Sequence, residues 1–388
     1  PPGSKDLDQA VLIRRRPGSG YRVFYAIADV GAFVQPGGAL DAEAWRRGQT
    51  LYLPDGNVPL HPPLMSEGAA SLLPDQDRLA VLWTVDLDGD GVAAGVDVRR
   101  ALIRSTAQLD FAGVQQSLAK GDPHPSVALL PEVGRLRRAQ AVHRGAIELG
   151  VPEQQVEADG SGGGRLVLRP RLLVEEWNAE ISLLTGMCAA EMVFDGGVGV
   201  LRTVPDPEEE TVAALRRSAA RLGVDWPEQA TPAEALAGLD PARPEALAIH
   251  VAGTRLLRGA GYTAFDGEVP VKSGHAGIGA RYAHVTAPLR RLVDRYCAEA
   301  CLAVNAGREI PEWARVQLAR LPSAMGVSDR IANHAERACL AQAQAWALRD
   351  RVGEVFSATV VRAGSDADGE VFVASPPVIA PCVGTELS

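Results

Sequence analysis

Alternating apolar and polar positions near the start of the chain predict paired β-strands. Residues 10–15 and 21–27 (YRVFYAI) alternate in this way on either side of the turn sequence PGSG, so we expect them to form a hairpin. Residues 79–87 and 91–105 repeat the pattern around the turn sequence DGDG. Because strands joined by tight turns pair antiparallel, this region predicts an antiparallel sheet.

The apolar spacing then changes to a helical period. Residues 128–144 and 170–195 carry apolar side chains three and four positions apart, which is typical of helices packed on a core. Further helices are expected over residues 208–222, 231–237, 244–258, 288–305 and 311–350. Proline and glycine predict an extended loop at 55–63 and flexible segments at 158–165 and 273–277.

The end of the chain returns to a strand pattern. From residue 355 the sequence reads FSATVVRA and then GEVFVAS, and we expect the start of a small β-barrel there. We therefore predict one domain over residues 1–351 and a second over residues 352–388. Since strands come first and helices follow, the pattern favours the α+β class, with a mixed or antiparallel sheet core surrounded by helices.

Composition and charge narrow the function classes. No window holds 18 consecutive apolar residues, and the first residues are polar, so we expect neither a membrane span nor a signal peptide. The five cysteines are odd in number and widely spaced, which favours reduced thiols and a cytoplasmic location. With a net charge of −9, any nucleic-acid path must be a local basic groove rather than a basic surface.

Two aspartates at the start of the chain are the sharpest chemical feature. Asp6 and Asp8 are two positions apart in an extended segment, so both carboxylates project to the same side. Hard oxygen donors of this kind suit Mg²⁺ or Mn²⁺ bridged to a phosphate. A polar turn before a strand explains the same spacing, and on spacing alone it is the more common explanation.

A second polar motif lies near residue 288. In TAPLRR, residues 286–291, Thr286 is expected to cap a helix and Pro288 to lie in its first turn. Arg290 and Arg291 would then oppose the helix dipole, which indicates either a phosphate partner or pairing with carboxylates. His284 is a candidate substrate contact, although a buried histidine with internal partners is the more frequent case.

Together these segments resemble the catalytic domain of the ribonuclease II/R family, the RNB catalytic domain, over about residues 1–351. The family's opening pattern D-x5-D-x-D-D-A is met in part by DLDQA at residues 6–10, and TAPLRR resembles its TSPIRR signature. Other matches, in order, are AIADV at 26–30, LYLPD at 51–55, VPL at 58–60, LMSEG at 64–68, SL at 71–72 and LVEEWN at 173–178. Each piece is weak alone, and their ordered occurrence is specific.

The resemblance implies a bacterial enzyme that degrades single-stranded RNA processively from its 3′ end to nucleoside 5′-monophosphates. Asp6, Asp8 and Arg290 would be catalytic, and Asp6, Asp8 and Gln9 would hold Mg²⁺ or Mn²⁺. Tyr52 would stack on a base, a contact that accepts every base. Arg290 would hold the scissile phosphate.

The same resemblance implies further RNA contacts. Glu175 and Glu336 would lie near the terminal nucleotide, and ribose hydroxyl contacts would select RNA over DNA. The implied RNA-binding set is Tyr52, Glu175, His284, Arg290, Arg291 and Glu336. The tail would begin an OB-type RNA-binding barrel, and we expect a monomer that needs no partner subunit.

Three departures from the family pattern bear on activity. Gln9 stands where the family has a fourth aspartate, and its neutral oxygen weakens a metal site. The family's first aspartate would fall one position before Pro1, in a preceding segment that we expect to exist. Leu149 lies near where some relatives carry a second stacking aromatic, so Tyr52 would stack alone.

Three functions remain open from the sequence. The first is an active 3′-to-5′ exoribonuclease. The second is an RNA-binding pseudonuclease in which Gln9 has abolished hydrolysis. The third is a metal-dependent hydrolase of a small molecule, which leaves TAPLRR and Tyr52 unexplained.

Overall fold

The structure is a computed structural model that describes residues 3–54, 56–158, 164–169, 171–363 and 368–384. Its main sheet has four antiparallel strands, β1 (Gln9–Arg15), β2 (Tyr21–Ala28), β5 (Asp77–Leu87) and β6 (Ala93–Arg104), in the order β1-β2-β5-β6. β1 and β2 form one hairpin and β5 and β6 form another, and residues 29–76 connect the two hairpins. The predicted hairpins at 10–27 and 79–105 are both confirmed.

Two helices cover one face of this sheet. They are α4 (Leu173–Asp195) and α8 (Leu292–Asn305), and both are apolar around much of their circumference. Trp83 and Tyr25 from the strands share one core with Ile181 of α4 and Tyr296 of α8. A helix buried on several sides carries little polar surface, which is why apolar residues occupy most of the middle of α4, from Ile181 to Ala190.

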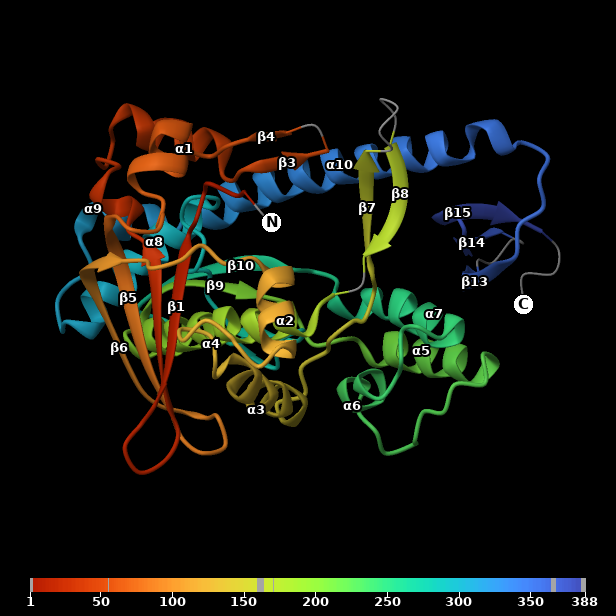
Figure 1. Ribbon diagram of the computed structural model, residues 1–388, viewed down its shortest axis with the longest axis horizontal. Helices are drawn as coiled ribbons and strands as arrows, with labels where there is room; N and C mark the ends of the chain where they lie inside the picture. Colours follow the sequence, from red (N-terminus) through yellow and green to blue (C-terminus); the bar gives the residue numbers. More distant parts are fainter. Residues whose placement is uncertain (1–2, 55, 159–163, 170, 364–367, 385–388) are drawn as a thin grey trace.

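The remaining elements surround this core or extend away from it (Figure 1). The helices are α1 (Ala39–Arg47), α2 (Phe111–Ala119), α3 (Leu130–His143), α5 (Glu209–Arg221), α6 (Pro232–Ala237), α7 (Pro244–Gly253), α9 (Glu312–Leu318) and α10 (Leu321–Leu348). The short paired strands are β3 (Leu51–Leu53) with β4 (Gly56–Val58), β7 (Glu153–Ala158) with β8 (Gly164–Arg169), β9 (Val198–Thr203) with β10 (Gly261–Asp266), and β11 (Gly274–His275) with β12 (Ala280–Arg281). Single turns of 3₁₀ or π-helix lie at Val30–Ala32, Met65–Ala69, Thr254–Leu257 and Arg349–Arg351.

The helix predicted over residues 288–305 begins later than expected. Its N-cap is Arg291, which is extended (φ −135°, ψ 130°) and bridges to Gln49. The carboxylate of Asp294 accepts the Ala287 N–H at 2.7 Å and the Arg291 guanidinium at 2.9 Å. These bonds hold residues 287–291 as a turn before the helix. Thr286 is therefore not the cap, and the arginines do not lie in the first turn.

The single helix predicted over residues 311–350 is two helices. Helix α9 ends at Leu318 and α10 begins at Leu321, with Pro322 in its first turn. Proline has no N–H to donate, and its ring clashes with the carbonyl four residues earlier, here that of Leu318. Helix α10 then runs along one side of the molecule (Figure 1).

Several loop predictions also change. Part of the loop expected at 55–63 is strand β4, and residues 273–277 contain strand β11 rather than a flexible segment. The helix expected over 244–258 ends at Gly253 and continues as a 3₁₀ turn. Of the segment at 158–165, residues 159–163 lie outside the described residues. Helix α2 and the β9–β10 pair were not predicted.

The C-terminal residues form a three-stranded antiparallel sheet, β13 (Ala358–Ala363), β14 (Asp368–Ala374) and β15 (Pro377–Val383). Val361 and Phe372 of this sheet pack on Leu247 and Ala248 of α7, at the far end from the main sheet (Figure 1). The boundary after residue 351 and the OB-type barrel stay predictions. Across the described ranges, no helix is both long and apolar enough to cross a bilayer.

Candidate active site

Asp8 and Arg290 form the centre of the site. Asp8 directly precedes β1, and its carbonyl accepts the Ala28 N–H at 2.8 Å, which extends the β1–β2 ladder by one residue. Its side chain is buried, with Oδ1 accepting the Leu289 N–H at 2.8 Å and Oδ2 accepting Arg290 Nε at 2.6 Å. A helix N-terminus was expected at residues 286–291 to bind an anion. Instead, the backbone N–H of Leu289, in a loop, donates to the Asp8 carboxylate.

Burial controls the charge of Asp8. Desolvation raises the pKa of this carboxyl from 3.8 to about 6, and Arg290 and the Leu289 N–H only partly offset the rise. Breaking such a buried pair leaves an uncompensated charge, so each partner depends on the other. Asp8 is therefore ionised at neutral pH while Arg290 faces it.

Asp6 and Tyr52 lie beside this pair. Tyr52, on β3, donates its hydroxyl to Asp6 Oδ2 at 3.3 Å, and its ring is 55% exposed. The backbone ties β3 to the arginine loop, since the Thr50 N–H donates to the Arg290 carbonyl at 2.9 Å. An exposed aromatic face next to an arginine can stack on a base.

Gln9 uses both ends of its amide within the protein. Its Nε2 donates to the Thr286 carbonyl at 2.7 Å, and its Oε1 accepts the Tyr25 hydroxyl at 2.6 Å. The Tyr25 oxygen also lies 2.7 Å from Ser182 Oγ, on α4. The oxygen expected to bind metal is thus already a hydrogen-bond acceptor.

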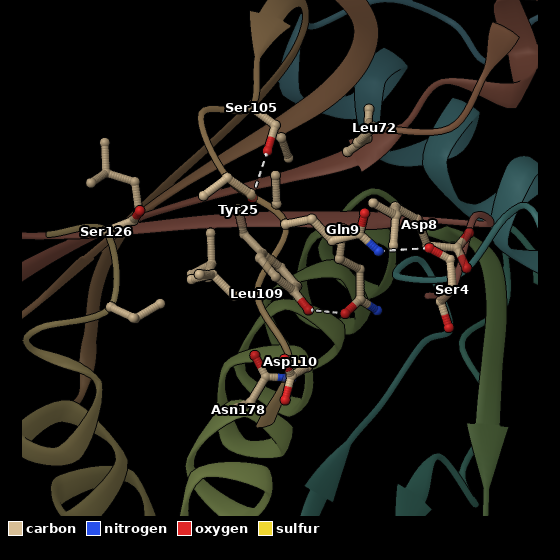
Figure 2. A pocket seen from close by; sticks show the side chains of 18 of the residues that line it. Ser4, Asp8, Gln9, Tyr25, Leu72, Ser105, Leu109, Asp110, Ser126 and Asn178 are labelled. Atoms are coloured by element: carbon tan, nitrogen blue, oxygen red, sulfur yellow. Dashed lines mark hydrogen bonds between the residues drawn. The ribbon is translucent and has the colours of Figure 1, made fainter. Parts of the chain in front are cut away.

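A cavity of about 1190 Å³ opens at these residues and extends along β1. In Figure 2, Asp8 and Ser4 lie at one end of the view and Ser126 at the other, with Tyr25, Asp110 and Asn178 between. Its walls include the apolar side chains of Leu12, Phe24, Leu82, Ile103, Phe111, Val114, Val127 and Leu130. Its cationic side chains are Lys5, Arg14, Arg104 and Arg290.

A second cavity of about 430 Å³ meets the first at Tyr52 and Arg290, which line both. Its other wall comes from α10, through Ala332, Ala335 and Glu336. The structure therefore brings Arg291 and Glu336, which are 239 and 284 residues from Tyr52 in the sequence, to the predicted site. The small alanines keep this wall close to the arginine loop.

Two predicted RNA contacts lie elsewhere. Glu175 closes the first turn of α4, where its carboxylate accepts the Leu172 N–H at 2.9 Å and Arg169 Nη1 at 2.8 Å. His284 accepts or donates at Tyr262 Oη (2.9 Å) and packs edge-on against Tyr282. Neither residue is among those that line the two cavities.

Sequence reasoning missed other residues of the cavity. Asn178 lies three residues after Glu175 in the same motif and lines the cavity in its place. Asp110 also lines it and caps α2 by accepting the Gly113 N–H at 2.9 Å. An aspartate before an apolar stretch is a cap signal, and it would have identified α2. Leu149, by contrast, packs in a separate core with Leu215 and Leu236.

The donors of the site fit a magnesium ion that also binds substrate. Within the described residues, no group of three or more histidine, cysteine, aspartate or glutamate side chains could hold a metal by itself. Mg²⁺, however, is commonly bound by one or two carboxylates with waters and substrate phosphates. Asp6 and Asp8 supply two carboxylates in one cavity, and each Asp8 oxygen keeps a second lone pair.

Comparison with known families decides the classification. The model of the RNB domain matches residues 1–304. The chain belongs to the RNB family. Ribonuclease R of Aquifex aeolicus is 28% identical to it over 373 residues, which cover 92% of this chain and 52% of that protein. The chain thus spans about half the length of such curated relatives.

Solved structures share the fold of this RNB chain. RNase R of Mycoplasma genitalium, in complex with ribose-methylated single-stranded RNA, matches with a TM-score of 0.87 at 20% identity, over 98% of this chain and 61% of that one. Yeast Ssd1, described as a pseudonuclease, matches with a TM-score of 0.79 at 18% identity, over 97% and 48%. At these identities the likeness shows the fold, which is the predicted α+β RNB type.

Proposed function

We propose that this chain is the catalytic part of a 3′-to-5′ exoribonuclease that hydrolyses single-stranded RNA to nucleoside 5′-monophosphates. The observation that carries the proposal is the pairing of the buried Asp8 with the partly exposed Arg290, which lines both cavities, with Asp6 and the exposed Tyr52 beside it. Family membership and the RNA bound to the M. genitalium RNase R support it. The small-molecule hydrolase does not account for a stacking aromatic at this place.

The Arg290 side chain binds the scissile phosphate in this proposal. Arg290 donates its Nε–H to Asp8, and the Arg290 side chain is 40% exposed. The Nη donors of Arg290 can therefore reach a phosphate that enters either cavity. Aimed donors of this kind offset the charge that develops on phosphate oxygens in the transition state. Asp8 fixes the direction of the guanidinium by the 2.6 Å bond to Nε.

Asp6 and Asp8 would hold Mg²⁺ or Mn²⁺. A bound ion supplies an activated water and stabilises the leaving oxygen. Tyr52 stacks on a base near the 3′ end, and Glu336 offers an acceptor to a ribose hydroxyl in the smaller cavity. Arg291, held by Asp294, mainly fixes the loop. We expect the protein to act as a monomer in the cytoplasm.

The decisive test is digestion of 5′-labelled single-stranded RNA by the full-length protein, with Mg²⁺ or Mn²⁺. We expect a ladder that shortens from the 3′ end and ends in mononucleotides, and we expect Asp8→Asn to abolish it. Shortening that persists in Asp8→Asn would assign the cleavage to another site or a contaminant.

A pseudonuclease is the second candidate. Gln9 adds no charge to the site, and the fold is shared with the pseudonuclease Ssd1. This candidate predicts tight RNA binding without shortening in either metal. Binding and cleavage both absent would reject single-stranded RNA as the ligand.

A further inference from the structure

Gln9 differs from Asp6 and Asp8 in being uncharged, and both ends of its amide are hydrogen-bonded, the nitrogen to the Thr286 carbonyl and the oxygen to the Tyr25 hydroxyl. We propose that Gln9 is a positioning residue that fastens the loop at 286–291 to the start of β1, and that it is not a metal ligand. This inference rests on the proposed nuclease function of the site. It concerns the residue at which this chain departs from the aspartate of the family pattern.

The hydrogen bonds around Gln9 run in one direction. The Thr286 carbonyl can only accept, so the Gln9 Nε2 must face it, at 2.7 Å. The Gln9 Oε1 then faces the Tyr25 hydroxyl, which donates at 2.6 Å. Tyr25 is buried, and burial raises the pKa of its phenol, so the hydroxyl keeps its proton. Ser182 Oγ, at 2.7 Å, donates to Tyr25 in turn.

A carboxylate cannot replace this amide. Aspartate or glutamate at position 9 would place an acceptor against the Thr286 carbonyl and lose the bond that the amide donates. The side chain of aspartate is also one methylene shorter. The departure from the family pattern is therefore matched by its surroundings, which are built for a group with one donor and one acceptor.

The loop that Gln9 fastens is the loop that carries Arg290. Three bonds join it to the start of β1: Gln9 Nε2 to the Thr286 carbonyl, and the two Asp8 oxygens to the Leu289 N–H and to Arg290 Nε. A metal at Asp8 would use the same oxygens that hold the loop. The bond from the neutral Gln9 amide does not involve those oxygens, so it would keep the loop in place with a metal bound.

The test compares Gln9→Met, Gln9→Asp and Tyr25→Phe with the wild-type full-length protein. For Gln9→Met we expect kcat on single-stranded RNA to fall about tenfold or more, with KM and Mn²⁺ affinity within about twofold. We expect Gln9→Asp not to exceed the wild-type rate. Tyr25→Phe should lower kcat less, and adding it to Gln9→Met should lower kcat no further because the two share one chain of bonds.

The opposite result is equally definite. If Gln9 is a ligand, Gln9→Met weakens Mn²⁺ binding, measured by electron paramagnetic resonance, about tenfold or more. Gln9→Asp, which restores the family pattern, would then tighten the metal and raise the rate. Either result overturns the proposal. Gln229→Met, at an exposed glutamine between α5 and α6 that lines neither cavity, is the matched control.

Amide hydrogen exchange separates this inference from the proposed activity. In Gln9→Met we expect the Leu289 N–H to exchange about tenfold faster or more, because the loop has lost one of its bonds. Unchanged exchange of Leu289 would overturn the positioning role even in an active enzyme. Faster exchange in a protein that cleaves no RNA would support the positioning role and reject the nuclease. If Gln9→Met does not fold, Ser182→Ala tests the same chain of bonds more mildly.

Discussion

The Arg290 guanidinium pairs with Asp8 and also lines both cavities, and a lysine could not do both. Arg290 binds Asp8 through Nε at 2.6 Å and lines both cavities with the rest of the fork. Lysine has one compact ammonium and cannot reach two partners in a fixed plane. The charge alone is therefore not what the site requires.

Arg290→Lys is predicted to lower kcat about 100-fold, the usual effect of losing an aimed transition-state donor. Single-turnover cleavage of labelled RNA measures it. Arg315→Lys, which changes a surface pair with Asp266, should leave the rate unchanged. A rate for Arg290→Lys within threefold of wild type, roughly 0.6 kcal/mol, would show that charge suffices.

Glu180 on α4 is buried between Arg137 and Arg144 and is predicted to make stability depend on pH. Desolvation raises its pKa from 4.5 to about 7, and the two arginines only partly offset the rise. The protonated form thus favours the folded state below pH 4.5, and this stabilisation is lost as the pH rises through 7. Glu180→Gln should therefore stabilise the protein at pH 8 by up to about 3 kcal/mol.

Urea unfolding at pH 5 and pH 8 measures this difference. At pH 5 the gain from Glu180→Gln should fall to about 1 kcal/mol or less, because the carboxyl is then protonated in the folded state. The control is Glu191→Gln. Glu191 lies on α4 like Glu180 but forms an exposed ion pair with Arg281, so this substitution should change the unfolding free energy by less than about 1 kcal/mol at either pH. An equal gain at both pH values would mean that Glu180 does not titrate.

At the scale of elements, helix α3 approaches helix α4 closely at Gly134. A Cβ at Gly134 would lie 2.3 Å from Cγ of Trp177, which is nearer than atoms can pack. Gly134→Ala is therefore predicted to destabilise the protein by about 1–3 kcal/mol, despite the better helix propensity of alanine. Chemical denaturation gives the value.

A glycine-to-alanine substitution in α10 should raise the free energy of unfolding instead of lowering it. A Cβ at Gly326 would meet nothing nearer than Arg330 Nη1, at 3.7 Å. Gly326→Ala should then stabilise by about 0.5–1 kcal/mol, the propensity gain alone. Equal effects at the two positions would show that the approach of α3 to α4 does not limit residue size.

The elements that the sequence predicted well are those whose signals are local. Strands β1, β2, β5 and β6 and helix α4 follow the periodicity of their own residues. The start of α8 could not be predicted, because Asp294 and Gln49 hold Arg291 in an extended conformation. Gln49 is more than 200 residues from Arg291 in the sequence, so the spacing of residues around Arg291 gives no sign of it.

The same distinction applies to the site. Asp6, Asp8, Tyr52 and Arg290 were named from motifs, and the structure places all four at one cavity. The bonds of Gln9 to Tyr25 and Thr286 depend on contacts between distant segments, so the motif did not show them. The motifs therefore predicted which residues form the site. The role of each side chain could be inferred only from its contacts in the structure.

For the whole molecule, the net charge of −9 predicts that the proposed RNA binding is restricted to the cavities. Five cationic side chains line them: Lys5, Arg14, Arg104, Arg290 and Arg291. For single-stranded RNA, each phosphate that the protein neutralises adds about −0.7 to the slope of the logarithm of the association constant against the logarithm of the salt concentration. The predicted slope is thus no steeper than about −3.5.

Fluorescence anisotropy of labelled single-stranded RNA, bound by this chain in increasing KCl, gives that slope. Double-stranded RNA of the same length serves as the control for surface binding. A slope steeper than about −6 would mean that arginines outside the cavities also contact phosphates.

The pairing of Asp8 with Arg290 joins residues 282 positions apart, and this has a consequence for synthesis on the ribosome. At about 5–20 residues per second, the first member of the pair emerges roughly a quarter of a minute to a minute before the second. Until then the nascent chain has its aspartates but no arginine to face them. The proposed active site is thus incomplete over that interval, while the chain is still attached to its own messenger.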